Sequence, residues 1–212
     1  MDQKILASKK HIFWDFDGVI KESVEIKSTA YEELFLRWGK RVSFKVRDHH
    51  KLNGGMSRFD KIPLYLSWTT EDANKISIEK LCNDFSKLVK SKVIGSSWVP
   101  GVIDLIDYLY SNNRLSYLVT ATPQDEIEDI LCELQITHFF KEIIGSPKNK
   151  SIAIGEIIDM HKIVKHDAVM IGDSETDFIA AQDNNIDFIL RKTNENNELQ
   201  LNINCKMVNN FL

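Results

Sequence analysis

The second half of the chain alternates short apolar runs with amphipathic segments, and this alternation constrains the fold more than any other feature. Runs rich in β-branched residues suit strands, and the segments between them space their apolar residues as helices do. The predicted strands are 115–119, 142–144, 168–171 and 186–190, and the predicted helices are 124–134, 151–161 and 178–184. Strands that alternate with helices favour right-handed crossovers. We therefore predict an α/β fold whose parallel sheet is covered by helices on both faces.

Another strand is predicted at 11–14, where the run HIFWDFDGVI ends its apolar part on two carboxylates. Alternate residues of a strand point the same way, so Asp15 and Asp17 should be directed at one small volume. Like charges that close are costly, and a divalent cation, a shared proton or a lysine would relieve the repulsion. The alternative is a strand that runs into an ordinary Asp-Gly turn at Gly18.

The stretch between these two regions is predicted to be helical. Helices are expected at 28–40, 44–52, 57–68 and 78–92, with another at 102–110 where the α/β pattern resumes. Gly54 and Gly55 form a loop that places Ser57 and Arg58 at a helix start, where they could touch a ligand or simply cap and solvate a turn. His49 and His50 lack further metal ligands at suitable spacing and are predicted to be solvated. The asparagine-rich segment from Thr193 is predicted to be a loosely ordered end with one terminal strand or helix.

Composition limits the partners that such a chain can have. With 212 residues and 43% hydrophobic content, it can form one domain plus an inserted unit. The 27 basic and 31 acidic residues give a net charge of −4 without a basic block, which argues against nucleic-acid and membrane binding. Three scattered cysteines suggest reduced thiols, and the sequence shows no signal peptide or membrane-spanning run. We therefore expect a cytoplasmic protein with a small partner.

Polar side chains gather at the carboxyl ends of the predicted strands, which is where ligands bind in open parallel sheets. They are Asp15 and Asp17 after the first strand, Thr120 after the second, Lys148 and Lys150 after the third, and Asp173 and Asp177 after the fourth. Carboxylates supply the hard oxygen ligands that magnesium prefers. A hydroxyl and an ammonium can position and neutralise a phosphoryl group.

Four motifs in this order resemble those of the haloacid dehalogenase-like hydrolases. They are DFDGV at 15–19, LVT at 118–120, a lysine at 148–150 and GDSETD at 172–177. Within that family the chain is similar to phosphoglycolate phosphatase-like and β-phosphoglucomutase-like members. The resemblance implies a Rossmann-like catalytic core of residues 1–20 and 99–212, with an inserted helical cap domain of residues 21–98. The run LNGGMSR resembles the cap loop that reaches the active site in the family.

The resemblance also implies roles for individual residues. Asp15 would be the nucleophile that attacks phosphorus and becomes an aspartyl-phosphate, and Asp17 would be the general acid and base. Thr120 and the backbone of Ala121 would donate hydrogen bonds to the phosphoryl oxygens.

The remaining roles concern the metal, the lysine and the substrate. Asp173 would hold Mg²⁺ together with Asp15 and the backbone carbonyl of Asp17, and Asp177 would support the site. Lys150 is the preferred phosphate-binding lysine because it immediately precedes a helix. Lys148 remains an alternative, since the Lys-Pro-x-Pro arrangement frequent in relatives is missing here. Arg58 is predicted to contact substrate from the cap.

The leading functional hypothesis is a Mg²⁺-dependent phosphatase, a monomer or homodimer, that acts on a small phosphorylated metabolite. A phosphomutase would use the same fold and is not excluded by the sequence. A dehalogenase fits less well because it has no need for Asp17 and magnesium. A phosphorylatable receiver domain would place its phosphoacceptor after a middle strand of the sequence, and a silent binding protein would not require every catalytic residue type.

Overall fold

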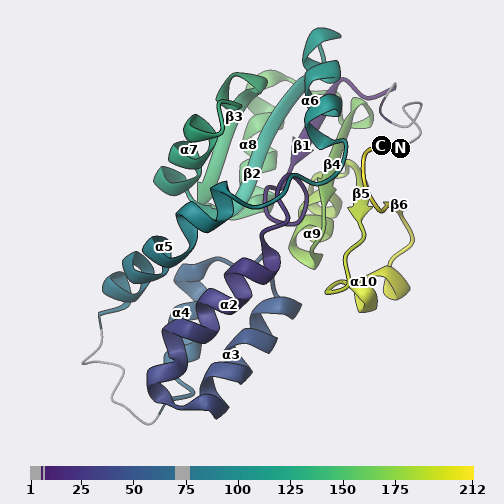
Figure 1. Ribbon diagram of the computed structural model, residues 1–212. Helices are drawn as coiled ribbons and strands as arrows, with labels where there is room; N and C mark the ends of the chain where they lie inside the picture. Colours follow the sequence, from purple (N-terminus) through teal and green to yellow (C-terminus); the bar gives the residue numbers. More distant parts are fainter. Residues whose placement is uncertain (1–5, 7, 70–76) are drawn as a thin grey trace.

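Figure 1 shows a computed structural model of the protein, which describes residues 6, 8–69 and 77–212. The chain forms two layers, and a parallel sheet lies at the centre of the larger one. Within the described residues the sheet has six strands in the order β3-β2-β1-β4-β5-β6, and every neighbouring pair is parallel. The strands are β1 (His11–Trp14), β2 (Leu115–Pro123), β3 (Phe140–Ser146), β4 (Ala168–Gly172), β5 (Asp187–Arg191) and β6 (Lys206–Val208). The predicted parallel α/β fold is confirmed. Its first strand, β1, is central, so its carboxyl end lies beside those of β2 and β4.

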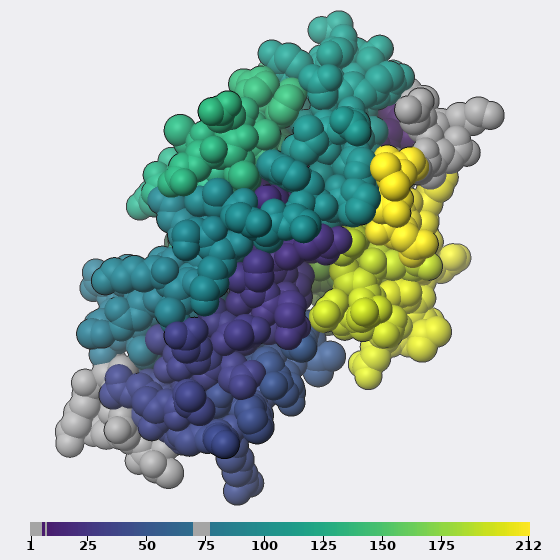
Figure 2. All heavy atoms as spheres, in the orientation of Figure 1, coloured from purple at the N-terminus to yellow at the C-terminus, as the bar shows by residue number. Residues whose placement is uncertain are grey.

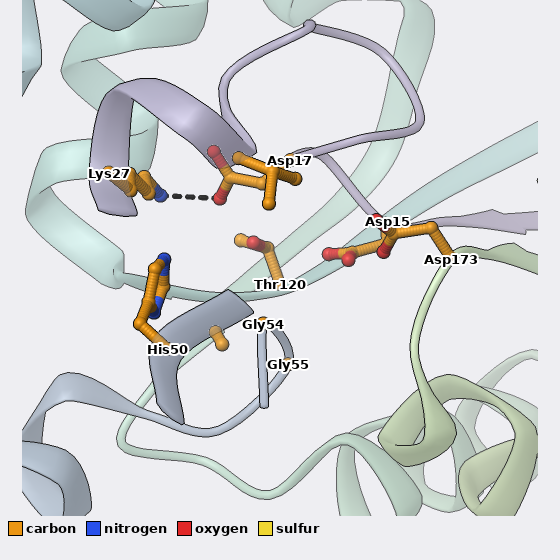
Figure 3. Close-up of a pocket in the computed structure, with 10 residues that line it drawn as sticks. Asp15, Asp17, Lys27, His50, Gly54, Gly55, Thr120 and Asp173 are labelled. Carbon is orange, nitrogen blue, oxygen red and sulfur yellow. Dashed lines mark hydrogen bonds and ion pairs between the residues drawn. The ribbon is translucent and has the colours of Figure 1, made fainter. Parts of the chain in front are cut away.

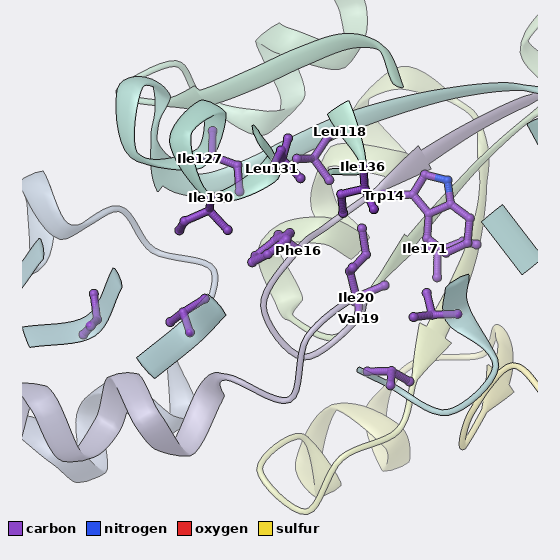
Figure 4. Packing of buried hydrophobic residues seen from close by; sticks show 14 of the residues in the cluster. Trp14, Phe16, Val19, Ile20, Leu118, Ile127, Ile130, Leu131, Ile136 and Ile171 are labelled. Atoms are coloured by element: carbon purple, nitrogen blue, oxygen red, sulfur yellow. The ribbon is translucent and has the colours of Figure 1, made fainter. Parts of the chain in front are cut away.

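Alternate residues of β1 build two separate cores. Ile12 and Trp14 belong to the cluster that contacts α6 (Val102–Ser111) and α7 (Gln124–Glu133). Phe13 belongs to the cluster that contacts α8 (Lys150–His161) and α9 (Glu175–Asn184). All three side chains are fully buried. Residues 12–14 of the strand are all apolar because both of its faces are covered, as expected for a parallel sheet. Figure 4 shows Phe16 and Leu118 near the α7 side chains and Trp14 near Ile136 and Ile171.

A layer of helices is inserted between β1 and α6 in the sequence and lies beside the carboxyl ends of the strands (Figure 1). It consists of α2 (Val24–Phe35), α3 (Lys40–Leu52), α4 (Arg58–Leu66) and α5 (Ile78–Ile94), with a short 3₁₀ turn at Leu36–Trp38. Serine side chains start two of them: Ser57 accepts from the Phe59 N–H before α4, and Ser77 accepts from the Lys80 N–H before α5. The division into domains at residues 20/21 and 98/99 stays a prediction.

A helix was expected at residues 28–40. The observed α2 begins before residue 28 and ends before residue 40. The α-helix starts at Val24, and its regular part stops at Phe35 before the 3₁₀ turn. Gly39 adopts a positive φ of 94°, ends the 3₁₀ turn and forms the N-cap of α3, so the helical run stops at the predicted glycine although its α-helical part stops at Phe35.

The C-terminal segment is more ordered than the sequence predicted. It forms α10 (Asn197–Asn202) and β6, which adds the last strand to one edge of the sheet. In Figure 2 this segment (yellow) and the region of α7 and β3 (green) lie on opposite sides of the molecule. Asn196 explains part of the order, because its Nδ2 donates to the carbonyls of Asp173 at 2.7 Å and Arg191 at 2.8 Å.

Among the described residues, the structure contains no helix long and apolar enough to cross a membrane.

Candidate active site

Asp15 lies directly after β1, and Asp173 lies directly after the neighbouring β4. The Asp15 N–H donates to the carbonyl of Ile171 at 3.0 Å, which holds the turn beside β4. Figure 3 shows the carboxylates of Asp15 and Asp173 side by side. Gly18 is required at this point, since its φ is +76° and a Cβ there would lie 2.1 Å from Asp173 Oδ2. The structure thus brings together two of the predicted site residues.

Lys150 reaches the same place from the start of α8. Asn149 begins this helix, because its Oδ1 accepts from the Ser151 N–H at 2.8 Å. Lys150 is the first helical residue, and its Nζ lies 3.0 Å from Asp15 Oδ1 and 2.6 Å from Asp177 Oδ1.

The alternative lysine is directed elsewhere. Lys148 precedes the N-cap, has a side chain that is 41% exposed and pairs with Glu156 at 2.6 Å. The structure therefore brings Lys150, and not Lys148, into the cluster.

Asp177 is fully buried and has partners on both carboxylate oxygens. Its Oδ1 accepts from Lys150, and its Oδ2 accepts from the Ser174 hydroxyl at 2.6 Å and the Ser174 N–H at 3.1 Å. This capping box fixes Asp177 at the start of α9. Its position fits the predicted supporting role.

The carboxylates in the cluster are strongly perturbed. Burial raises the pKa of Asp15 to about 7, with Asp177 and Asp17 adding to the effect and Lys150 opposing it. Burial and the Asp15 charge raise the pKa of Asp173 well above its ordinary value. Burial alone would lower the pKa of Lys150, but its carboxylate neighbours outweigh burial and raise it. The carboxylates of Asp15, Asp173 and Asp177 can carry more negative charge than the ammonium group of Lys150 balances.

A divalent cation would fit this cluster. Carboxylate oxygens of Asp15, Asp173 and Asp177 lie within 4.8 Å of one another. Among the described residues, Asp15 Oδ1 is a buried oxygen whose contact with Lys150 Nζ at 3.0 Å is not matched by any further hydrogen bond. Asp177 is already satisfied, so Asp15 and Asp173 are the side chains free to act as ligands. Hard carboxylate oxygens match Mg²⁺.

Asp17 points away from that cluster, toward the helical layer. Its Oδ1 accepts from the Ser23 hydroxyl at 2.6 Å, and its Oδ2 accepts from Lys27 Nζ and, at 3.1 Å, from the Thr122 hydroxyl. Figure 3 shows Lys27 directed at this carboxylate. Burial opposes ionisation of Asp17, but Lys27 and these hydrogen bonds lower its pKa overall. The two aspartates of the DFD motif therefore occupy different electrostatic environments.

Thr120 and Ala121 line the pocket between these two environments. Thr120 is 1% exposed. The strand β2 continues to Pro123, beyond its predicted end, and its register with β3 is irregular between Val119 and Pro123. The regular pairing of β2 with β3 is therefore interrupted next to the site.

The pocket itself is small, about 20 Å³, and both layers line it. The helical layer contributes Lys27, His50, Gly54 and Gly55. Space of this size holds about one water molecule. The predicted contact of the Gly54–Gly55 loop with the site is therefore present. We call this arrangement, in which both layers line the pocket, the closed arrangement.

Arg58 was predicted to contact substrate, and the structure places it in a buried ion pair between the layers. Its Nη1 and Nη2 each donate to the Glu126 carboxylate at 2.7 Å, and Nη1 also donates to Ser86 at 2.5 Å. Arg58 also lines a second small cavity that adjoins the first. The substrate contact stays a prediction.

The prediction that His50 is solvated is wrong. His50 is 4% exposed, its ring is tilted against that of Tyr31 with centroids 4.7 Å apart, and its Nδ1 hydrogen-bonds to Lys61 at 2.8 Å. It is buried because α3 turns it inward, toward α2 and α4. Sequence reasoning also missed Lys27, although Ser23 and Lys27 are four residues apart and share a helix face close behind the DFD motif.

Comparisons with known proteins agree with this arrangement. A family model described as haloacid dehalogenase-like hydrolase matches residues 12–191. A phosphoglycolate phosphatase of Aliivibrio fischeri is 32% identical over 88 residues, which are 39% of each chain. Phosphoglycolate phosphatase 1 of Pseudomonas aeruginosa is 23% identical over 81% of this chain and 65% of its own. The chain thus spans less than two thirds of the length of either relative. The structure of CbbY from Rhodobacter sphaeroides, in complex with phosphate, superposes with a TM-score of 0.78 at 16% identity and covers 96% of this chain and 95% of that one.

Proposed function

Because the chain belongs to the haloacid dehalogenase-like hydrolases, we propose that it is a Mg²⁺-dependent phosphatase that hydrolyses a small phosphomonoester through an aspartyl-phosphate on Asp15. The observation that carries the proposal is the position of Asp15. Its buried carboxylate pairs with Lys150, has no further hydrogen-bond partner on Oδ1, and lies beside Asp173 and the pocket. The names of the relatives support phosphatase chemistry.

The first step would be attack of an Asp15 carboxylate oxygen on phosphorus. The bond between phosphorus and the ester oxygen breaks, and the leaving oxygen takes a proton from Asp17. Lys150 would neutralise charge on the phosphoryl group, and Thr120 would donate a hydrogen bond to it. Bound to Asp15 and Asp173, Mg²⁺ would supply further charge neutralisation.

The second step would return the enzyme to its starting state. Asp17 takes a proton from water, whose oxygen attacks phosphorus, and the bond to Asp15 breaks to release phosphate. In the closed arrangement Asp17 is held as an ionised carboxylate by Lys27, which suits this base role. To act as an acid in the first step, Asp17 must first be protonated, which its ion pair with Lys27 opposes.

A phosphate-release assay tests the function directly. With Mg²⁺ present, the protein should release phosphate from at least some members of a panel of small phosphomonoesters. Removal of the metal with EDTA should lower the rate by at least about 100-fold, because charge neutralisation at phosphorus is lost, and added Mg²⁺ should restore it. A rate that EDTA leaves unchanged would refute the metal requirement. Transfer of phosphate to a second hydroxyl of a hexose phosphate, without net release, would instead indicate a phosphomutase.

The glycine loop offers a test of the contact between the layers. A Cβ at Gly55 would lie 1.9 Å from Thr176 Oγ1 and 2.4 Å from Ser174 Oγ, whereas a Cβ at Gly54 would meet nothing within 4 Å. Gly55→Ala should therefore displace the loop and lower kcat/KM about tenfold, since misplacement of this order is costly in catalysis. Gly54→Ala is the matched control and should stay within about twofold of the wild type. Equal values for the two variants would show that the close approach is not needed for activity.

A further inference from the structure

A buried arginine ties the turn of residues 16–22, which follows β1, to the end of β5. Arg191 is the last residue of β5 and is 8% exposed. Its Nη1 lies 3.1 Å from Glu22 Oε2, and its Nη2 contacts Glu22 Oε1, which is the bidentate geometry of an arginine with a carboxylate. In the described part of the chain, neither residue lines the pocket around Asp15. The side chain of Glu22 is 38% exposed, so the ion pair adds little to the free energy of unfolding, and its main consequence is geometric.

The same guanidinium group also binds two backbone carbonyls. Its Nη1 donates to the carbonyl of Gly18 at 3.3 Å, and its Nε donates to the carbonyl of Asn209 at 3.2 Å. Gly18 lies near the start of the turn and Glu22 ends it, so one side chain holds both parts of the turn. Asn209, in the segment after β6, holds the arginine in place. A planar group with several donors in fixed directions can make these contacts together, whereas the single ammonium of a lysine cannot.

The turn that Arg191 holds also carries Asp17. Within the turn, the Gly18 N–H donates to the Lys21 carbonyl at 2.8 Å, and the Lys21 N–H donates to the Phe16 carbonyl at 3.1 Å. Asp17 lies between Phe16 and Gly18 in the chain, so a displacement of the turn also displaces its carboxylate. The orientation of Asp17 therefore depends on the contacts that fix the turn to the sheet.

Asp15 is held by a different set of contacts. Its N–H donates to the carbonyl of Ile171 at 3.0 Å, and its Oδ1 lies 3.0 Å from Lys150 Nζ. None of these groups belongs to the turn of residues 16–22. Loss of the Arg191 side chain should therefore displace Asp17 while Asp15 keeps its place, which separates the two aspartates experimentally.

We propose that Arg191 is a positioning residue, which holds the turn of residues 16–22 so that Asp17 can transfer a proton to the leaving oxygen. This inference rests on the proposed function, in which Asp17 gives up that proton as the bond between the leaving oxygen and phosphorus breaks. An alkoxide leaves poorly without the proton, whereas p-nitrophenolate is stable as an anion and leaves without it. The proposal therefore predicts a defect that depends on the leaving group.

First-turnover rates test this prediction, measured as release of the leaving group with enzyme in excess and Mg²⁺ present. The substrates are p-nitrophenyl phosphate and the best alkyl phosphomonoester of the panel. Arg191→Met and Arg191→Lys should lower the rate on the alkyl substrate at least about tenfold, because a general acid must lie within hydrogen-bond reach of the oxygen it protonates. Both variants should change the rate on p-nitrophenyl phosphate by less than about threefold. The matched control Lys192→Met removes a positive charge from the next residue and should stay within about twofold of the wild type on both substrates.

Amide hydrogen exchange adds a measurement that does not require activity. Exchange in residues 18–22 should be faster in Arg191→Met than in the wild type and in Lys192→Met, whereas exchange in α8 should not change. All comparisons are made at a temperature where thermal unfolding shows every variant to be folded. An equal loss of rate on both substrates, or an alkyl rate that stays at the wild-type level, would overturn the positioning role even if the wild type releases phosphate. A wild type that releases no phosphate would refute the proposed function. In that case, faster exchange confined to the turn would support the hold of Arg191 on it, and unchanged exchange would overturn it.

Discussion

Asp15→Asn should abolish phosphate release, with a fall in kcat of at least about 10⁴-fold, as is typical when a covalent nucleophile is removed. The amide that replaces the carboxylate is a poor nucleophile and cannot form the aspartyl-phosphate. The side chain would keep its place after β1, because the backbone N–H of residue 15 is held by the Ile171 carbonyl. The measurement is the initial rate on the best substrate of the panel.

The loss should not come from unfolding. Burial and the nearby carboxylates raise the pKa of Asp15 to about 7, which means that its ionised form is disfavoured in the folded protein. A neutral amide relieves this crowding, so the thermal midpoint of Asp15→Asn should equal or exceed that of the wild type. The exposed Asp159→Asn in α8 is the matched control and should retain full activity. Substantial activity in Asp15→Asn would rule out this nucleophile.

The central features of the fold could be predicted because they depend on local sequence. The apolar run before Asp15 and the alternation of strands with helices after residue 115 encode β1 and the parallel order. Once the sheet is known, the rule that ligands bind at the carboxyl ends of strands brings Asp15, Thr120 and Asp173 together. The prediction that these residues lie together does not depend on the position of the helical layer.

The contacts between the two layers could not be predicted in this way. Arg58 and Glu126 are 68 residues apart, and their ion pair depends on how α4 docks against α7. The same is true of Lys27 with Thr122, 95 residues away. No periodic pattern specifies such docking, so the sequence predicted a substrate contact for Arg58 and a solvated His50, and neither the ion pair nor the burial was foreseen. The charges of a chain identify which groups need partners, but tertiary packing selects the partners.

The choice between the two lysines illustrates an intermediate case. Both Lys148 and Lys150 precede the same predicted helix, and the sequence could not fix where that helix begins. Asn149 decides the question, because it caps α8 and makes Lys150 the first helical residue. A shift of two residues separates an exposed lysine from one whose side chain is 6% exposed.

Lys150→Met should lower both activity and stability, and the two effects have one cause. The variant leaves Asp15 and Asp177 buried without the ammonium that lies 3.0 Å and 2.6 Å from them. Removing one member of a buried ion pair costs about 3–5 kcal/mol of the free energy of unfolding. Loss of the positive charge at the phosphoryl group should lower kcat/KM by about 10²–10³-fold. Denaturant unfolding and phosphate release measure the two quantities.

Lys148→Met is the matched control, because it removes the same charge two residues away. The ion pair of Lys148 with Glu156 is exposed, so its loss should change the free energy of unfolding by at most about 1 kcal/mol. Activity should stay within about twofold of the wild type, and rates are compared at a temperature where both variants remain folded. If Lys148→Met lost more activity than Lys150→Met, the phosphate-binding role would belong to Lys148, and the α8 start would have to shift when substrate binds. The reverse result would support Lys150, which lies 3.0 Å from Asp15 and 2.6 Å from Asp177, as the phosphate-binding lysine.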